Sequence, residues 1–269
     1  MKAAISGYNG FIAQHLDKAL RSKDIQVIGI PRKIIYNVVE LNNFFSVNHP
    51  DYIIHTAAYG NKFSQDNDLE TLFANVMVLM NLLQSSRSVH YKAFVNFSTS
   101  SVTLPYETFY SATKASGERL VRAFVNKYNK PVFSIRPYTV IGRGEPSEHL
   151  IPKLIESCLL GTEMPFVPYP VHDFIDADDL SDAVVFLLQH AQSLQGQIVD
   201  IGTGIGTTNQ EILKIVEKVT GRKANVKVAD SLRPYDTKSW SSNPVVLESV
   251  GWVPKRSVEQ SVRSMVSSM

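Results

Sequence analysis

Short apolar runs alternate with stretches of helical periodicity through the first half of the chain. The runs are rich in Ile, Val, Phe and Ala, and we expect strands there, at 2–6, 25–30, 51–55, 91–97 and 131–136. Between them, apolar residues recur three and four positions apart, which predicts helices from Phe11, over about 68–86 and over 109–128. This alternation predicts an α/β fold: a doubly wound parallel sheet with helices on both faces.

A glycine-rich turn follows the first strand. Gly7 and Gly10 precede the helix from Phe11, and Ala13 is a small residue three positions after Gly10. Strand, glycine turn and helix form the context of a dinucleotide-binding fingerprint. Gly7 permits the tight turn, and Gly10 lets the backbone approach a pyrophosphate at the helix N-terminus. The alternative is an ordinary strand-to-helix turn.

Beyond Arg136, prolines and glycines interrupt the pattern, as is typical of a smaller lobe built from short elements. Thr207 or Thr208 is expected to cap a helix, with Glu211 placed for a capping box. The other elements expected here are a helix at 178–190, a strand at 197–201 and a helix from about Val258. The domains expected are a dinucleotide-binding domain over 1–140, rejoined by 172–203, and a smaller C-terminal lobe over 141–171 and 204–269.

Composition narrows the class of protein without identifying a partner. The chain has 269 residues, 44% of them hydrophobic, and a net charge of +2, so neither a nucleic-acid nor a membrane partner is indicated. Cys158 is the single cysteine, which excludes an internal disulfide and suits a reducing compartment. No signal peptide is recognised before the first strand, and no metal site is predicted. We therefore expect a cytoplasmic protein.

Tyr110 and Lys114 form the most informative pair for chemistry. Four positions apart on one helix, they share a face, and the ammonium is expected to draw the pKa of the phenol down from its usual value of about 10. Such a phenol can exchange a proton with a hydroxyl group while hydride moves at the attached carbon. The spacing alone also fits an ordinary exposed helix face.

Several segments together resemble the extended short-chain dehydrogenase/reductase family, whose members are nucleotide-sugar epimerases, dehydratases and ketoreductases. The likeness covers nearly the whole chain. In chain order it rests on Gly7-x-x-Gly10-x-x-Ala13, Asp51-Tyr-Ile-Ile-His-Thr-Ala-Ala58, Asn75, Asn96-Phe-Ser-Thr-Ser-Ser-Val102, Tyr110-x-x-x-Lys114, Arg136-Pro-Tyr-Thr-Val-Ile-Gly142, His172-Asp-Phe-Ile-Asp-Ala-Asp-Asp179, Arg233-Pro-Tyr-Asp236 and Gly251-Trp-Val-Pro254.

The resemblance implies a Rossmann domain, a smaller substrate-binding lobe and a set of site residues. The catalytic residues would be Thr99, Tyr110 and Lys114, with Ser98, Ser100 and Ser101 competing for the role of the hydroxyl. The cofactor-binding residues would be Gly7, Asn9, Gly10, Phe11, Ile12, Thr56, Ala57, Ala58 and Asn75, together with Tyr110 and Lys114. The substrate-binding residues would be Ser100, Thr139, His172 and Arg233.

The end of the second strand bears on the choice of cofactor. NAD-specific members of the family keep an acidic residue there to bind the ribose 2′-hydroxyl. This chain has Gly29-Ile-Pro-Arg-Lys33 instead, and Arg32, helped by Lys33, is suited to a 2′-phosphate. NADP is therefore expected, with NAD as the alternative if the segment is only a solvated basic turn.

Departures from the family pattern narrow the reaction. Ser100 and Ser101 stand where the 4,6-dehydratases have Asp-Glu, which disfavours 4,6-dehydration. Thr139 and His172 replace the family's usual Asn and Arg, which leaves the substrate contacts open. We expect an NADPH-dependent reductase of a nucleotide-linked 4-keto (6-deoxy) sugar. The alternatives are a nucleotide-sugar 4-epimerase with tightly bound NAD and a non-catalytic dinucleotide sensor. The resemblance also implies a homodimer formed through the helices at 68–86 and 109–128.

Overall fold

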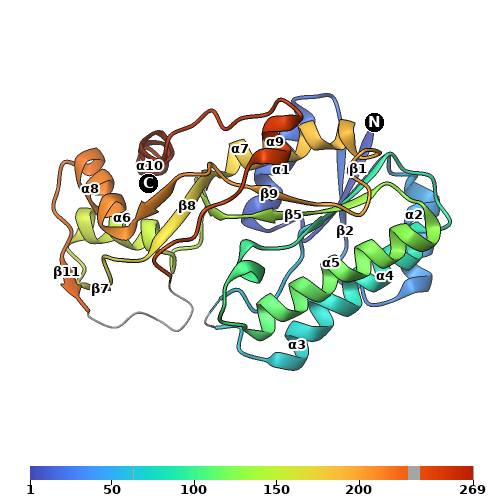
Figure 1. Ribbon diagram of the computed structural model, residues 1–269, viewed down its shortest axis with the longest axis horizontal. Coiled ribbons are helices and arrows are strands. Elements are labelled where there is room, and N and C mark those ends of the chain that lie inside the picture. Colours follow the sequence, from blue (N-terminus) through green and yellow to red (C-terminus); the bar gives the residue numbers. More distant parts are fainter. Residues whose placement is uncertain (63, 230–236, 269) are drawn as a thin grey trace. The chain divides into compact units, whose positions relative to one another are not determined.

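The computed structural model describes residues 1–62, 64–229 and 237–268, and the chain divides into two compact units (Figure 1). The first unit consists of Met1–Thr103, Glu107–Pro137 and Ser181–Val199. The second consists of Leu104–Tyr106, Tyr138–Leu180 and Asp200–Met269. That the first unit binds the cofactor and the second binds the substrate stays a prediction.

The first unit is built on a six-stranded sheet with the strand order β2-β1-β3-β4-β5-β9. Its strands are β1 (Lys2–Ser6), β2 (Gln26–Ile30), β3 (Tyr52–His55), β4 (Ala93–Phe97), β5 (Val132–Pro137) and β9 (Ile198–Ile201). The pairs from β2 through β5 are all parallel, which confirms the doubly wound sheet. In the sheet, β2 lies on one side of β1 and β3 on the other, so the strand order reverses direction at β1. The carboxyl ends of β1 and β3 therefore flank the point where such sheets bind ligands.

Helices cover both faces of this sheet (Figure 1). They are α1 (Phe11–Arg21), α2 (Val38–Asn48), α3 (Asp68–Leu72), α4 (Val78–Ser86), α5 (Phe109–Tyr128) and α7 (Ala177–Leu187). Between α3 and α4 the chain forms a π-helical turn, η1 (Phe73–Met77), so the single helix expected over 68–86 is interrupted in its middle. The core of this unit includes Phe45, Ile53, Leu82 and Phe94.

Helix α2 was not expected from the sequence. Only Leu41 and Phe45 of this helix are buried, so the apolar periodicity is short and Val39 and Val47 lie exposed. Its start is fixed locally instead: the Asn37 side chain accepts hydrogen bonds from the amides of Val39 and Glu40.

A row of buried polar side chains crosses the sheet near the carboxyl ends of its strands. Ser6 is the register partner of His55, His55 of Asn96, and Asn96 of Ser134. The Ser6 hydroxyl lies 2.7 Å from His55 Nδ1, and Asn96 Nδ2 donates to the Ser134 hydroxyl at 3.1 Å. These hydrogen bonds offset part of the cost of burying polar groups.

The second unit contains two small sheets. One joins β10 (Gly206–Thr208), β8 (Val171–Asp176) and β6 (Thr139–Ile141), and the other joins β11 (Val226–Val228) to β7 (Met164–Phe166). Its helices are α6 (Leu150–Leu160), α8 (Asn209–Thr220), α9 (Val245–Ser249) and α10 (Val258–Val266). Thr208 and Glu211 form the expected capping box at the start of α8. Apolar residues of α6, α8 and α10, among them Leu154, Ile212 and Val262, share one core.

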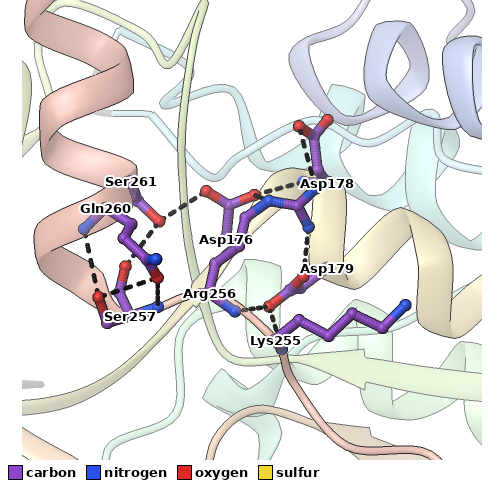
Figure 2. Close-up of polar contacts among 8 residues, drawn as sticks. All are labelled: Asp176, Asp178, Asp179, Lys255, Arg256, Ser257, Gln260 and Ser261. Atoms are coloured by element: carbon purple, nitrogen blue, oxygen red, sulfur yellow. Dashed lines mark hydrogen bonds and ion pairs between the residues drawn. The ribbon is translucent and has the colours of Figure 1, made fainter.

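The aspartates of the motif at 172–179 form a hydrogen-bonded anchor with the segment that follows Pro254, within the second unit (Figure 2). The buried Asp179 carboxylate accepts hydrogen bonds from the amides of Lys255 and Arg256, at 2.8 and 2.7 Å, and from the Arg256 guanidinium. Asp176 accepts a hydrogen bond from the Ser261 hydroxyl at 2.6 Å. The aspartates at the end of β8 and the start of α7 thus hold the segment that leads into α10. Among the described residues, no helix is both long enough and apolar enough to span a membrane.

Candidate active site

The glycine turn packs tightly against the segment that follows β3. Gly7 has φ +73°, and a Cβ atom placed on it would lie 2.8 Å from the Ala57 amide nitrogen and 3.0 Å from Thr56 Oγ1. The Gly10 amide donates to the Gly7 carbonyl at 2.9 Å, which closes the turn. Only glycine fits this backbone at residue 7. The structure therefore brings together the predicted cofactor residues of the glycine turn and of the segment after β3.

Helix α1 begins at this turn with an open N-terminus. Gly10 supplies no capping side chain, and the first turn of the helix carries no acidic residue. The amides of Phe11 and Ile12 belong to this first turn, and Asn9 precedes it. A helix end of this kind attracts an anion such as a pyrophosphate. The turn and the helix end therefore fit a dinucleotide.

Arg32 and Lys33 lie exposed just beyond β2, the neighbour of β1. The Arg32 side chain is 80% exposed and makes an ion pair with Glu70 at 3.4 Å. An exposed ion pair of this length is weak, so the guanidinium can exchange this partner for a phosphate.

Thr99 and Tyr110 come together between the end of β4 and the start of α5. The Thr99 hydroxyl hydrogen-bonds to the phenol and also lies 2.7 Å from the Ser101 hydroxyl. Ser98 is directed elsewhere, because its hydroxyl donates to Glu118 at 2.6 Å. Among the four candidate hydroxyls, Thr99 is thus the one whose partner is Tyr110. Ser100, the third candidate, is buried at the same strand end.

The sequence analysis predicted that Lys114 lowers the pKa of the Tyr110 phenol, and this prediction was wrong: in the structure the pKa is raised. Tyr110 keeps some exposed surface, but its hydroxyl lies deep among protein atoms, and this burial raises the pKa of the phenol to about 12. The hydrogen bond from Thr99 opposes this rise only in part. Burial also lowers the pKa of the Lys114 ammonium to about 8, against the opposing charge of Glu118. A low-dielectric environment disfavours the charged form of both groups, so the phenol holds its proton at neutral pH.

Asn75 sits in the π-helical turn and is almost fully buried. Its side-chain oxygen accepts from the Tyr59 amide at 3.0 Å, and its nitrogen donates to the Tyr59 carbonyl and to the Thr113 hydroxyl at 2.9 and 3.0 Å. Asn75 therefore ties the segment after β3 to α5, next to Lys114.

His55 is a neutral buried residue below the site. Burial, together with the charge of Lys114, lowers the pKa of its ring to about 3. Nδ1 is held by Ser6, whereas no hydrogen-bond partner for Nε2 is found among residues 1–62, 64–229 and 237–268.

Two of the predicted substrate residues, Thr139 and His172, meet in the second unit. Thr139 Oγ1 lies 3.4 Å from His172 Nδ1. The His172 ring also lies 5.3 Å, centroid to centroid, from the ring of Trp240, which the sequence analysis did not select. Arg233 lies outside the described residues.

Asp173, next to His172, binds the segment that follows Trp240 and the loop after β9. Its fully buried carboxylate accepts hydrogen bonds from Thr203, Gly204 and Ser242, at distances from 2.6 to 3.0 Å. The signal in the sequence was an acidic residue inside the strand, which needs such donors when it is buried.

The model of the NAD dependent epimerase/dehydratase family matches residues 3–202. With the parallel sheet and the glycine turn, this match defines the class: the chain belongs to the NAD dependent epimerase/dehydratase family and is an NAD(P)-dependent enzyme. This confirms the resemblance on which the sequence analysis rested.

The similar proteins include a GDP-L-fucose synthase and UDP-sugar epimerases. The chain is 27% identical to a GDP-L-fucose synthase of Sinorhizobium fredii over 98% of this chain and 95% of that protein. It is 23% identical to a UDP-glucose epimerase of Bacillus subtilis described as uncharacterized, over 99% of this chain and 97% of that one. The UDP-glucose 4-epimerase of Thermus thermophilus, solved with NAD, shares the fold with a TM-score of 0.87 at 22% identity, over 99% and 98% of the two chains.

Proposed function

We propose that this protein is an NADPH-dependent reductase of a nucleotide-linked 4-keto sugar, with a 4-keto-6-deoxyhexose as the preferred class. The observation that carries the proposal is the Tyr110 phenol beside the Thr99 hydroxyl, in a buried environment that favours the neutral phenol. Reduction of a ketone consumes a proton at the carbonyl oxygen, and a neutral phenol can donate it. Epimerisation would instead begin with removal of a proton from a hydroxyl group by the same residue.

Each catalytic residue then has a defined task. The bound nicotinamide supplies the hydride. Thr99 hydrogen-bonds to the keto oxygen of the sugar, and Tyr110 donates its proton to that oxygen. Lys114 binds the cofactor ribose.

The cofactor assignment rests on Arg32 and Lys33. Neither is acidic, both are exposed beyond β2, and a guanidinium can bind a phosphate in bidentate fashion. The pyrophosphate is assigned to the turn at Gly7 and the amides of Phe11 and Ile12. The remaining cofactor residues would be Asn9, Gly10, Thr56, Ala57, Ala58 and Asn75.

The substrate class is supported by the relatives, whose names refer to GDP- and UDP-linked sugars. We assign Ser100, Thr139, His172 and Arg233 to substrate binding. The second candidate function is a 4-epimerase with tightly bound NAD, supported by epimerases of the same fold that were solved with NAD. A non-catalytic dinucleotide sensor is the third.

We also propose a homodimer and a cytoplasmic location. Exposed apolar side chains gather along α3 and η1, namely Leu69, Leu72, Phe73 and Met77. Phe109, at the start of α5, is 62% exposed. These are the helices through which the family resemblance implied dimerisation, and burial of these side chains would stabilise such a dimer.

The proposed cytoplasmic location rests on Cys158, a buried thiol in a chain with no second cysteine.

The test is NADPH oxidation, followed by absorbance, with a panel of GDP-, UDP- and dTDP-linked 4-keto-6-deoxy sugars and with NADH in parallel. We expect oxidation of NADPH with at least one of these sugars and a clear preference over NADH. Absence of consumption with every sugar contradicts the reductase. Release of bound NAD on denaturation, together with turnover of a UDP-sugar without added cofactor, would identify the epimerase.

A further inference from the structure

Glu118 is a buried carboxylate that the proposed reaction does not use. It lies on α5, one helical turn after Lys114, and only 5% of the residue is exposed. Its oxygens accept hydrogen bonds from Arg136 Nε at 2.7 Å and from Arg136 Nη2 at 2.8 Å. The Ser98 hydroxyl donates to the same carboxylate at 2.6 Å. A bidentate Arg–carboxylate pair with a further donor is a strong and geometrically specific arrangement.

These contacts join the elements that carry the candidate catalytic residues. Ser98 immediately precedes Thr99 at the end of β4, and Arg136 lies near the end of β5. Glu118 therefore connects the strand end that presents Thr99 to the helix that presents Tyr110 and Lys114. A shift of either element would break a buried charged hydrogen bond, which costs several kcal/mol.

Glu118 also affects Lys114 through its charge. Among the described residues, the titratable groups shown to interact with Lys114 through charge are Glu118, on its own helix, and His55, on β3. His55 is neutral, so Glu118 is the negative charge of this pair.

We infer that Glu118 is a positioning residue for the candidate active site. It fixes the end of β4 that carries Thr99 against α5, and it places a negative charge one helical turn from the Lys114 ammonium. The inference rests on the proposed function only for its consequence in turnover, because the charge of Lys114 can be measured without any substrate.

The direct measurement is an NMR titration of the protein carrying ¹³Cε-labelled lysine, with the Lys114 signal assigned by its loss in Lys114→Arg. In Glu118→Gln the shape of the side chain is kept and the charge is removed. We expect the pKa of Lys114 to fall by about one unit from its value near 8, because the burial of the ammonium is then unopposed. Glu40→Gln, on the exposed face of α2, is the matched control and should leave the titration unchanged.

A second pair of variants distinguishes an effect of the Glu118 charge on Lys114 from a general loss of order in the site. Arg136→Gln leaves the Glu118 charge unbalanced and should raise the pKa of Lys114, the opposite sign to Glu118→Gln. Arg119→Gln, an exposed arginine on α5, is its control. If Glu118→Gln and Arg136→Gln move the pKa of Lys114 in the same direction, or if Glu118→Gln moves it by less than 0.3 unit, the inference is overturned.

Turnover provides an independent readout once a substrate is in hand. We expect Glu118→Gln to shift the alkaline limb of the kcat/KM profile to lower pH by the same amount as the NMR titration. Glu118→Asp keeps the charge but shortens the side chain, and should lower kcat while leaving that limb in place. If no sugar of the panel is turned over, the proposed function fails while the titration still decides the role of Glu118.

Discussion

Tyr110 and Lys114 share one buried environment that acts on them in opposite directions. Burial raises the pKa of the phenol to about 12 and lowers that of the ammonium to about 8. The sequence identified both residues, because their spacing on a helix is a local property. The sign of the shift on the tyrosine was not predictable, because the burial is produced by elements distant in sequence. The identity of such residues is therefore more readily predicted than their electrostatics.

Removal of the Tyr110 hydroxyl tests its assignment as proton donor. We expect Tyr110→Phe to lower kcat by about two orders of magnitude or more, the scale of general-acid catalysis, because no other group replaces the proton. The affinity for NADPH, measured by fluorescence titration, should change by less than about threefold. A variant that retains more than a tenth of the wild-type kcat would show that Tyr110 is not the donor.

Arg32 carries the predicted preference for NADPH. We expect Arg32→Ala to weaken NADPH binding about tenfold or more while NADH binding is unchanged, because only NADPH has the 2′-phosphate. Isothermal titration with both cofactors measures the ratio, and Arg119→Ala serves as the exposed control. Unchanged discrimination in Arg32→Ala would mean that the basic turn beyond β2 is only a solvated surface.

His55 makes the fold sensitive to acid. Its folded pKa of about 3 lies below the unfolded value of about 6.5, so the folded state binds fewer protons in this range. Stability is therefore fully present above pH 6.5 and is lost as the pH falls toward 3, by about 2 kcal/mol at pH 5. In urea unfolding, the wild type should lose about 2 kcal/mol more of its free energy of unfolding between pH 7 and pH 5 than His55→Gln does. If both proteins lose the same free energy of unfolding over this pH range, His55 is not the group responsible for the acid sensitivity.

At the scale of elements, the prediction succeeded where apolar periodicity was long. The strands of the parallel sheet and the helix α5 (Phe109–Tyr128) lie where they were expected. The short helix α2 was missed because it buries few apolar residues, and the π-helical turn at Phe73–Met77 was missed because an extra residue in one turn leaves no mark in composition. Both depend on tertiary packing rather than on local preference.

The turn at Gly7 offers a matched comparison of two substitutions. Gly7 and Gly221 both have positive φ, +73° and +67°, but a Cβ atom on Gly221 meets nothing within 4 Å. Alanine at either site should cost about 1 kcal/mol of unfolding free energy from backbone strain. Only Gly7→Ala forces Thr56 and Ala57 away, and we expect it to weaken NADPH binding at least tenfold. Equal NADPH affinity in Gly7→Ala and Gly221→Ala would count against this turn as the pyrophosphate site.

At the scale of the whole molecule, the sequence motifs proved to serve two purposes. Those at Gly7, Tyr110 and Lys114 meet in the candidate active site. The aspartates at the end of β8 and the start of α7 instead hold the segment before α10 through Arg256 (Figure 2). The first kind was recognised from local spacing and from the resemblance, the second from the resemblance, which does not separate chemistry from architecture. The partners of the buried carboxylates Asp173 and Glu118 required the structure.

The anchor should contribute measurably to stability. Asp179 is fully buried and bonds to Arg256 and to two backbone amides, so Asp179→Asn should lower the free energy of unfolding by about 2–3 kcal/mol. Asp178→Asn, whose carboxylate lies 3.9 Å from the same guanidinium, should cost less than about 1 kcal/mol. Urea denaturation followed by circular dichroism gives both values. Similar losses in the two variants would refute the special role of Asp179.

The polar row through Ser6, His55, Asn96 and Ser134 has a consequence for how the sheet assembles. In a parallel sheet, successive side chains point to opposite faces, so a slip of one residue between β1 and β3 would take His55 out of reach of Ser6. The same slip between β4 and β5 would part Asn96 from Ser134. Apolar strands tolerate misalignment, since one aliphatic side chain packs much like another. These buried pairs do not, because a misaligned strand would leave buried polar groups without hydrogen bonds, so they favour one alignment of the strands.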